Sequence, residues 1–147
     1  MEATKLDSLY DMMQKLTPAS STEEYDAFGA FFDENCTVWL KSMREWAEPS
    51  IGRYAVIDTL KESLTQVHID ERRVLSQSMS PDGSILFCEM KNRLNVLGDT
   101  LDPFFETAVV KFNDKGLIVD LKLYSKLFVS KIVPFISQYQ WQIIYNV

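Results

Sequence analysis

His68 is the first of five side chains in this sequence that can carry out acid–base chemistry. It is the only histidine, and an imidazole readily takes up and releases a proton near neutral pH. His68 directly follows a predicted helix, with Asp70 and Glu71 beside it. Two interpretations stay open: a general acid or base, or a cap that interacts favourably with the dipole at the C-terminal end of the helix.

Glu89 and Glu106 fall on predicted neighbouring antiparallel strands. Two carboxylates on one face of a sheet can share a proton or divide the roles of acid and base. Glu89, however, alternates with Lys91 and Arg93, a pattern typical of a solvated or subunit-facing sheet surface with cross-strand ion pairs. A bulge in a curved sheet would invert the direction of Glu106, so its side stays open.

Asn92 and Tyr10 are the remaining candidates for catalysis. Strand alternation places Asn92 on the same face as Leu86, Cys88, Met90 and Leu94, which predicts that its amide is buried. A buried amide must find partners, which are either backbone groups or a bound ligand that it orients. Tyr10 lies on the apolar face of the first predicted helix, where its hydroxyl either donates to an oxyanion or packs in the core.

The predicted substrate pocket is lined by large apolar and aromatic side chains. For the aromatic ones, packing in the core is the alternative. The predicted lining residues are Trp39, Leu40, Tyr54, Met90, Phe105, Thr107 and Leu123.

Helices are predicted in the first half of the chain. Apolar residues recur at three- and four-residue spacing from Leu6 to Leu16, and Pro18 ends that helix. Ser21 and Glu24 form a capping-box pattern at the start of a second helix. A short strand is expected at 37–40, a loop at 46–52 and a third helix at 53–66.

The second half of the chain has the character of β-structure. Strand-like segments cover 72–80, 84–97, 104–113 and 117–130, with turn-forming residues between them. The short links predict an antiparallel meander. The fold class is therefore α+β, with three N-terminal helices packed on one face of a curved, mainly antiparallel sheet.

Composition excludes several functions. The chain has 147 residues, 46% of them hydrophobic, and a net charge of −6, which argues against binding to nucleic acid or to anionic membranes. It contains no uninterrupted apolar run long enough for a signal peptide or a membrane span, so a cytoplasmic location is expected. Cys36 and Cys88 lie in apolar runs and are expected to be free, buried thiols. No metal-ligand spacing and no glycine-rich phosphate loop is present, so we expect no metal and no cofactor.

Three motifs resemble those of the SnoaL-like family, a branch of the nuclear transport factor 2-like superfamily. They are FFDENCT at 31–37, GRYAV at 52–56, and FNDKGLI at 112–118 followed by Tyr124. The resemblance covers about residues 5–128. Within the family, the residues look most similar to fungal tailoring isomerases and cyclases of polyketide and meroterpenoid metabolism. It implies a single domain over 1–147 with a cone-shaped fold, in which the sheet wraps round the third helix. The apolar tail at 129–147 is expected to dock on the cone or on a second subunit.

Two mechanisms known in the superfamily do not transfer to this sequence. The charged residues of the limonene-epoxide-hydrolase-like members fall on Met90, Asn92 and Leu123. The general base of the ketosteroid-isomerase-like members falls around 40–41, where there is no carboxylate. Any acid–base groups of this chain must therefore come from elsewhere in the cone.

The sequence leaves three hypotheses about function. The first is a cofactor-independent isomerase, cyclase or dehydratase that acts by acid–base catalysis on a hydrophobic polyketide- or terpenoid-derived molecule, with a homodimer as the expected assembly. The second is a non-catalytic carrier of a small molecule, and the third is a dimeric interaction module with a filled cone. The presence of a ligand cavity, and the groups that face it, would distinguish them.

Overall fold

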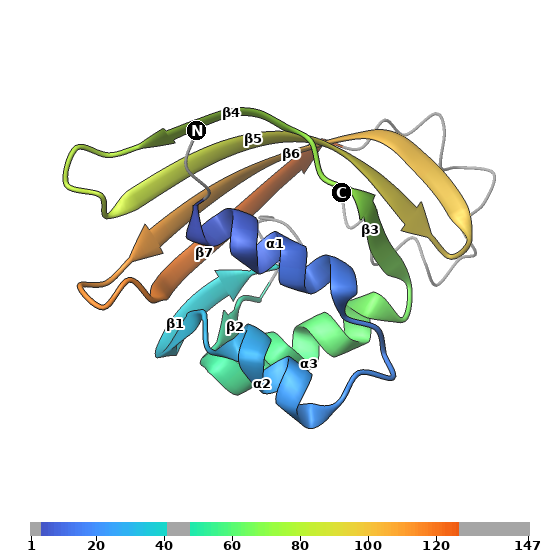
Figure 1. Ribbon diagram of the computed structural model, residues 1–147, viewed down its shortest axis with the longest axis horizontal. Helices are drawn as coiled ribbons and strands as arrows, with labels where there is room; N and C mark the ends of the chain where they lie inside the picture. Colours follow the sequence, from blue (N-terminus) through green and yellow to red (C-terminus); the bar gives the residue numbers. More distant parts are fainter. Residues whose placement is uncertain (1–3, 41–47, 127–147) are drawn as a thin grey trace.

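The computed structural model describes residues 4–40 and 48–126. In these residues three helices lie under the concave side of a strongly curved seven-stranded sheet (Figure 1). The helices are α1 (Lys5–Lys15), α2 (Thr22–Gly29) and α3 (Arg53–Leu64). The strands are β1 (Phe32–Trp39), β2 (Ser50–Ile51), β3 (Val67–Glu71), β4 (Val74–Met79), β5 (Ile85–Val96), β6 (Asp99–Phe112) and β7 (Ile118–Lys126). The expected fold class, three helices on a curved and mainly antiparallel sheet, is confirmed.

Capping boxes define the starts of the first two helices. The Thr4 hydroxyl accepts from the Asp7 backbone N–H and the Asp7 carboxylate accepts from the Thr4 backbone N–H, so both groups are satisfied at the start of α1. The predicted capping box of Ser21 and Glu24 is present at the start of α2. Gly52 precedes α3 without a side-chain cap. These local signals explain why the helices begin where they do.

The sheet order is β2-β1-β7-β6-β5-β3, and β4 also pairs with β5. The pairs β5–β6 and β6–β7 are antiparallel, as the meander predicts. Two features differ from the expectation: β1 starts at Phe32 rather than 37 and pairs with β7 in parallel, and β2 forms a strand within the expected loop. The parallel pair joins the first strand of the chain to the last described strand, a long-range contact that no local sequence pattern encodes.

A break between β3 and β4 interrupts one edge of the sheet. Both strands pair with β5, β3 along Arg93–Val96 and β4 along Leu86–Met90. Between them the Arg73 carbonyl accepts from the Lys91 N–H at 2.8 Å, and the Arg73 N–H donates to Asn92 Oδ1 at 3.3 Å. The strand expected at 72–80 is present as β4, which begins at Val74 after a corner at 72–73, whereas β3 at Val67–Glu71 was not expected.

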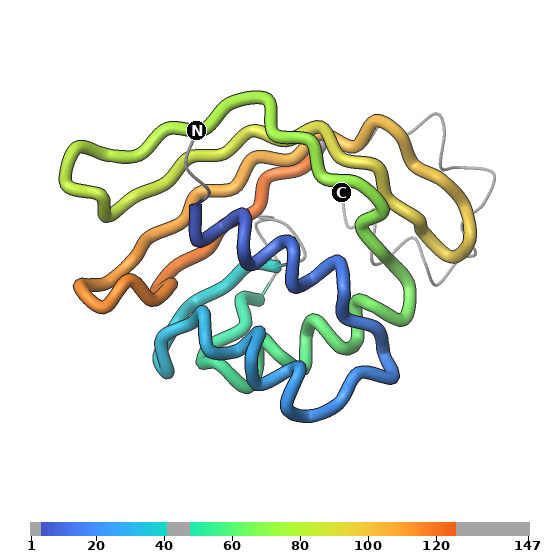
Figure 2. The backbone as a smooth tube through the Cα atoms, viewed as in Figure 1, coloured from blue at the N-terminus to red at the C-terminus, as the bar shows by residue number. Residues whose placement is uncertain are grey.

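The core lies between the helices and the concave face. Along β5 the predicted inward residues Leu86, Cys88, Met90, Asn92 and Leu94 are all buried. The expectation that Cys36 and Cys88 are free, buried thiols is also confirmed. Figure 2 shows the chain of β5 and β6 bending over α1, so α1 crosses the concave face, whereas α3 packs against α2, β1 and β2.

None of the helices in residues 4–40 and 48–126 has the length and apolar character that crossing a bilayer requires. The apolar tail at 129–147, expected to dock on the cone or on a second subunit, lies outside the described residues.

Gly52 provides a test of how α3 is placed. Its φ of 88° and ψ of 154° lie in a region that side chains rarely tolerate, and an added Cβ would lie 3.2 Å from the Glu34 carbonyl oxygen. We expect Gly52→Ala to lower the free energy of unfolding by about 1–3 kcal/mol. Urea denaturation measures this.

Gly83 is the matched control, because its φ is also positive, 72°, but no heavy atom lies within 4 Å of the added Cβ. Gly83→Ala should therefore carry the backbone strain without the steric contact. Equal losses in the two variants would contradict the packing described for Gly52.

Candidate functional site

Glu106 brings a carboxyl group to the inner side of the sheet. It lies on β6 opposite Met90 and two residues from the buried Ala108, so strand alternation directs its side chain towards the helices. Its Oε1 accepts a hydrogen bond from the Tyr10 hydroxyl at 2.6 Å. Burial raises the pKa of the Glu106 carboxyl, and this outweighs the opposing effects of the Tyr10 hydrogen bond and the Arg72 charge.

Tyr10 comes from the buried face of α1. Burial, together with the negative charge of Glu106, raises the pKa of the Tyr10 hydroxyl well above its usual range. Tyr10 therefore stays a hydrogen-bond donor at neutral pH. The pair can hold a proton between two oxygens between α1 and the sheet.

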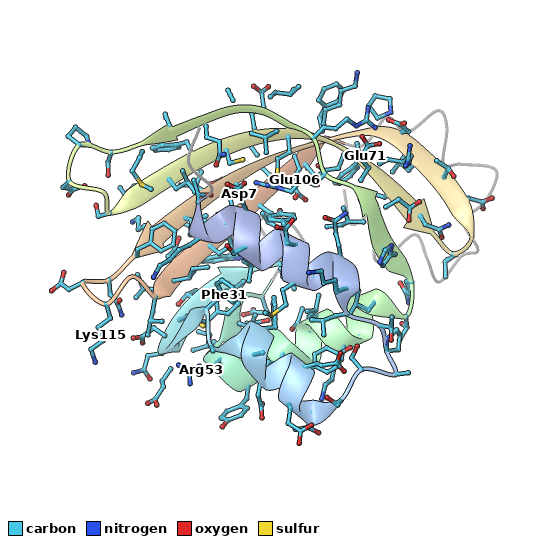
Figure 3. All side chains as sticks on the ribbon, in the orientation of Figure 1. Asp7, Phe31, Arg53, Glu71, Glu106 and Lys115 are labelled. Atoms are coloured by element: carbon cyan, nitrogen blue, oxygen red, sulfur yellow. The ribbon has the colours of Figure 1, made fainter. Side chains whose placement is uncertain are left out.

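Arg72 enters the same layer from the corner between β3 and β4. Its side chain is 9% exposed, and Nη1 donates to Asp7 Oδ1 at 2.6 Å. The guanidinium carbon lies 4.6 Å from the centre of the Tyr10 ring, a cation–π contact. Its Nε faces the Met90 sulfur at 3.2 Å. Asp7 and Glu106 both lie between α1 and the sheet, with Arg72 and Tyr10 linking the two elements (Figure 3).

Asp7 supplies the negative charge that Arg72 needs. Burial tends to raise the pKa of the Asp7 carboxyl, but hydrogen bonds from Thr4 and Arg72 outweigh it and lower the pKa below its ordinary value. Asp7 and Arg72 thus form an ion pair at neutral pH. Glu106 is left as the carboxyl of this layer whose protonation can change during a reaction.

No family model matches the sequence, and no curated protein matches it either. Solved structures do match the fold. A proposed polyketide cyclase from Xanthomonas campestris superposes with a TM-score of 0.62 at 16% identity, over 82% of this chain and 87% of its own. A proposed isomerase from Rhodopseudomonas palustris gives 0.65 at 16% identity, over 87% and 93% of the two chains. An NTF2-like protein of unknown function from Exiguobacterium gives 0.63 at 16% identity, over 84% and 98%.

The fold is the nuclear transport factor 2-like cone. At these identities the likeness establishes the fold alone, and the chemistry must be argued from the side chains.

Asn92 lies on the inner face of the cone, as alternation predicts, and it is 1% exposed. Its Oδ1 accepts from the Arg73 N–H. Its Nδ2 has no hydrogen-bond partner among residues 4–40 and 48–126. The interpretation as an amide bonded to the backbone holds for the oxygen, and ligand binding by the nitrogen stays a prediction.

Glu89 does not join Glu106, which corrects the expectation of a carboxylate pair. Glu89 lies opposite Thr107, whereas Met90 lies opposite Glu106, so the two carboxyl groups point to opposite faces of the sheet. Glu89 instead accepts from the Ser76 hydroxyl at 3.2 Å. The register shift between β5 and β6 falls beyond Asn92 and leaves the direction of Glu106 unchanged.

His68 lies on the edge strand β3 opposite Asn95, away from the inward row that contains Asn92. Its Nδ1 lies 3.1 Å from Asp70 Oδ1 and its Nε2 lies 3.0 Å from the Gln14 carbonyl oxygen. These contacts tie β3 to the last turn of α1. They favour the capping interpretation, although the cap belongs to α1 and not to the helix that precedes His68.

The predicted pocket residues divide between the two faces of the cone wall. Met90 and Leu123 are buried in the core, and Leu40 packs against it. Trp39, Phe105 and Thr107 belong to outward rows of the sheet, and Tyr54 on α3 is 75% exposed. The prediction that these four residues line an interior pocket is wrong. Strand alternation directs three of them away from the core, and the fourth lies on the exposed side of α3.

A hollow of about 270 Å³ lies at the outward row instead. It is lined by Glu89, Phe105, Glu106, Thr107, Tyr124 and Ser125. Glu89, Thr107 and Tyr124 form one cross-strand row there, on the face opposite the side chain of Glu106.

Two residues of the buried polar layer were not predicted, Arg72 and Asp7. A signal exists for Asp7, because Thr4 and Asp7 have capping-box spacing. The side chain of Arg72 points inward because the edge strand is broken between β3 and β4, and no pattern in the sequence predicts that break. Within the described part of the chain, no three His, Cys, Asp or Glu side chains are grouped as metal ligands would be.

The raised pKa of Glu106 predicts how stability depends on pH. Below the ordinary glutamate pKa of 4.5, folded and unfolded chains are both protonated at this group. As the pH rises further the unfolded chain ionises first, so the fold loses stability until the folded-state pKa is passed. We expect Glu106→Gln to become increasingly more stable than the wild type as the pH rises above about 4.5, until the raised folded-state pKa of Glu106 is passed.

Chemical denaturation at a series of pH values measures this difference. Glu89→Gln, on the opposite face, is the control for removal of a carboxylate from the same part of the sheet. The difference in unfolding free energy between Glu106→Gln and the wild type could instead stay constant with pH, or Glu89→Gln could show the same difference. Either result would show that burial does not raise the pKa of Glu106.

Proposed function

We propose that the protein is a cofactor-independent isomerase or cyclase of the SnoaL-like kind that acts by acid–base catalysis. The carrying observation is the Glu106 carboxyl, whose pKa burial raises and whose Oε1 is held at 2.6 Å by the Tyr10 hydroxyl. A carboxyl with a raised pKa is suited to accept and return a proton near neutral pH. The descriptions of two similar structures as a proposed polyketide cyclase and a proposed isomerase support the same kind of reaction.

The reaction proposed for Glu106 is transfer of a proton from carbon. The carboxylate removes a proton from a carbon next to a carbonyl group, and the electron pair of the C–H bond moves to the carbonyl oxygen to give an enolate. Where a carbon–carbon double bond lies next to that carbon, the product is a dienolate, and returning the proton to its far carbon isomerises the molecule. Attack of the enolate carbon on a second carbonyl closes a ring, and the new alkoxide takes the proton from Glu106. Both outcomes balance without an oxidant or reductant.

Tyr10 and Arg72 prepare the carboxyl for this task. The Tyr10 hydroxyl holds one carboxylate oxygen in place, so the other is available to the substrate. The charge of Arg72 counteracts part of the effect of burial on the pKa of Glu106.

The apolar character of the core supports a substrate with a hydrophobic skeleton. The side chains beside Glu106 on the inner face include Met90, Ala108 and Leu123. Such surroundings favour a polyketide- or terpenoid-derived molecule with few polar groups.

Exchange of carbon-bound hydrogen tests this proposal. The bicyclic ketone 2-tetralone carries acidic C–H bonds next to its carbonyl, and proton NMR in D₂O follows the loss of their signal. We expect the wild type to accelerate exchange over buffer and Glu106→Gln to lower that rate by about 10²–10⁴-fold, the usual contribution of a general base. Tyr10→Phe should give a smaller loss, because the carboxyl remains.

Glu89→Gln is the matched control and should exchange the ketone at the wild-type rate, since its carboxyl faces the other way. Binding of the ketone without exchange would favour the carrier hypothesis. Equal exchange by wild type and Glu106→Gln would reject Glu106 as the base.

For the assembly, we propose that the outer face of the sheet pairs with a second copy of the chain. Phe87 and Tyr124 are 46% and 45% exposed, and both project from this face. The same face carries Glu89 and Lys91 in an alternating charged row, which can pair with itself across a two-fold axis.

Sedimentation equilibrium tests the proposed dimer. Phe87→Asp should shift the protein towards the monomer, because it puts a charge into the centre of the proposed interface. Leu97→Asp is the control, since Leu97 is similarly exposed but lies in the turn between β5 and β6. A wild type that is monomeric at all concentrations would contradict the proposal.

A further inference from the structure

The orientation of the Asn92 amide is fixed by its neighbour. The Arg73 backbone N–H can only donate, so the atom that faces it at 3.3 Å must be the oxygen of the amide. The Nδ2 group must then point away from Arg73. Asn92 is 1% exposed, and Nδ2 has no acceptor among the described residues.

An unpaired donor at this position is unfavourable and is not needed for the fold. A buried N–H group that lacks an acceptor loses its bonds to water without replacement. The structural task of Asn92, to accept from Arg73 where the edge strand breaks, uses the oxygen alone. Among residues 4–40 and 48–126, therefore, nothing accounts for the nitrogen half of the side chain.

Asn92 and Glu106 lie on the same inner face of adjacent strands. Asn92 is opposite Phe104 and Glu106 is opposite Met90, so the two are diagonal neighbours across the β5–β6 pair. Diagonal neighbours of this kind are about 7–8 Å apart at their Cα atoms, within joint reach of one small functional group. One residue offers a donor without an acceptor, and the other offers a base.

Arg72, the cation of this layer, does not compete with Asn92 for a substrate oxygen. Arg72 is engaged by Asp7 at 2.6 Å and faces the sulfur of Met90. A neutral N–H donor fits an oxygen that is neutral before proton transfer and gains negative charge during it, as a carbonyl oxygen does.

We propose that Asn92 Nδ2 binds the carbonyl oxygen of the substrate and stabilises the enolate oxygen formed when Glu106 takes the neighbouring proton. The substrate class is accordingly a ketone with an acidic C–H bond, placed with its oxygen at Asn92 and that C–H bond at Glu106. This inference rests on the proposed function, because it assigns Glu106 the role of base. The C–H electron pair ends on the oxygen and the proton on Glu106, so no further reactant is needed.

Paired ligands isolate the interaction. Binding of 2-tetralone and of its hydrocarbon counterpart tetralin is compared in wild type and Asn92→Leu by calorimetry or ligand NMR. We expect the variant to bind the ketone about tenfold more weakly, the typical loss for one hydrogen bond, and the hydrocarbon about equally well. Equal weakening of both ligands, no weakening of the ketone, or no binding of either ligand to the wild type would overturn the inference.

The infrared carbonyl band of bound 2-tetralone gives a readout that a structural role would not move. It should lie at lower frequency in the wild type than in Asn92→Leu, because a hydrogen bond weakens the C=O bond. An unchanged band would overturn the inference.

Asn92→Asp covers the case in which the leucine variant does not fold. An aspartate keeps the acceptor for Arg73 and the shape of the side chain but, when ionised, offers no donor. Its own infrared band shows the pH at which it is ionised, and there the ketone should bind as weakly as expected for Asn92→Leu. Binding as tight as in the wild type would overturn the inference.

Failure of this inference is distinguishable from failure of the proposed function. Ketone binding that depends on Asn92, without hydrogen exchange, would reject the proposed function and leave the oxygen site in place. Hydrogen exchange that depends on Glu106 but is unchanged in Asn92→Leu would reject the role of Asn92 and leave the proposed function in place.

Discussion

The charge of Arg72 is the constraint on which the interior of this cone depends. A guanidinium that is 9% exposed requires an anion, and Asp7 of α1 provides it at 2.6 Å. That ion pair fixes α1 against the corner between β3 and β4, and it brings the Tyr10 ring to 4.6 Å from the guanidinium carbon. From there the Tyr10 hydroxyl reaches Glu106 on β6. Burial outweighs the opposing effects of the Tyr10 hydrogen bond and of the nearby cation, and so raises the pKa of Glu106. A lone arginine in this place would favour an ionised carboxylate, which is a weaker base.

The break in the edge strand is what makes that arrangement possible. In an unbroken strand Arg72 and Arg73 would continue the ladder along β5. At the corner, Arg72 instead turns inward, and Arg73 reaches outward to Asp102 at 2.7 Å. The backbone N–H that the break leaves at Arg73 is satisfied by Asn92, which sets the direction of that amide. One local irregularity therefore positions both a cation and a donor on the inner face. Irregularities of this type often re-aim side chains next to functional sites.

Local patterns in the sequence were sufficient to predict most helices and strands and the burial of one site residue. Alternation along β5 predicted the burial of Asn92, and the spacing of Ser21 and Glu24 predicted the start of α2. What could not be predicted depends on pairing between distant segments. The side on which Glu106 lies follows from its register with Met90, and the parallel pairing of β1 with β7 joins residues some eighty positions apart in sequence. The role of Arg72 needed both the break in the edge and the position of α1. For the same reason the sequence alone did not show that Phe105 and Thr107, predicted as pocket residues, face outward.

The inner face carries two polar groups that a core built only for stability would omit. Glu106 keeps a carboxyl where burial opposes its charge, and Asn92 keeps an N–H donor without an acceptor among the described residues. An acceptor alone at position 92 would satisfy the Arg73 N–H equally well. Unfavourable groups persist in proteins mainly where a function requires them, because most positions can be repacked at little cost. Here both lie on one face of two adjacent strands, diagonal to each other. A base and a hydrogen-bond donor at that separation are the two groups that formation of an enolate needs, and their coincidence in one place is the strongest physical argument that the interior of this cone is a site of chemistry.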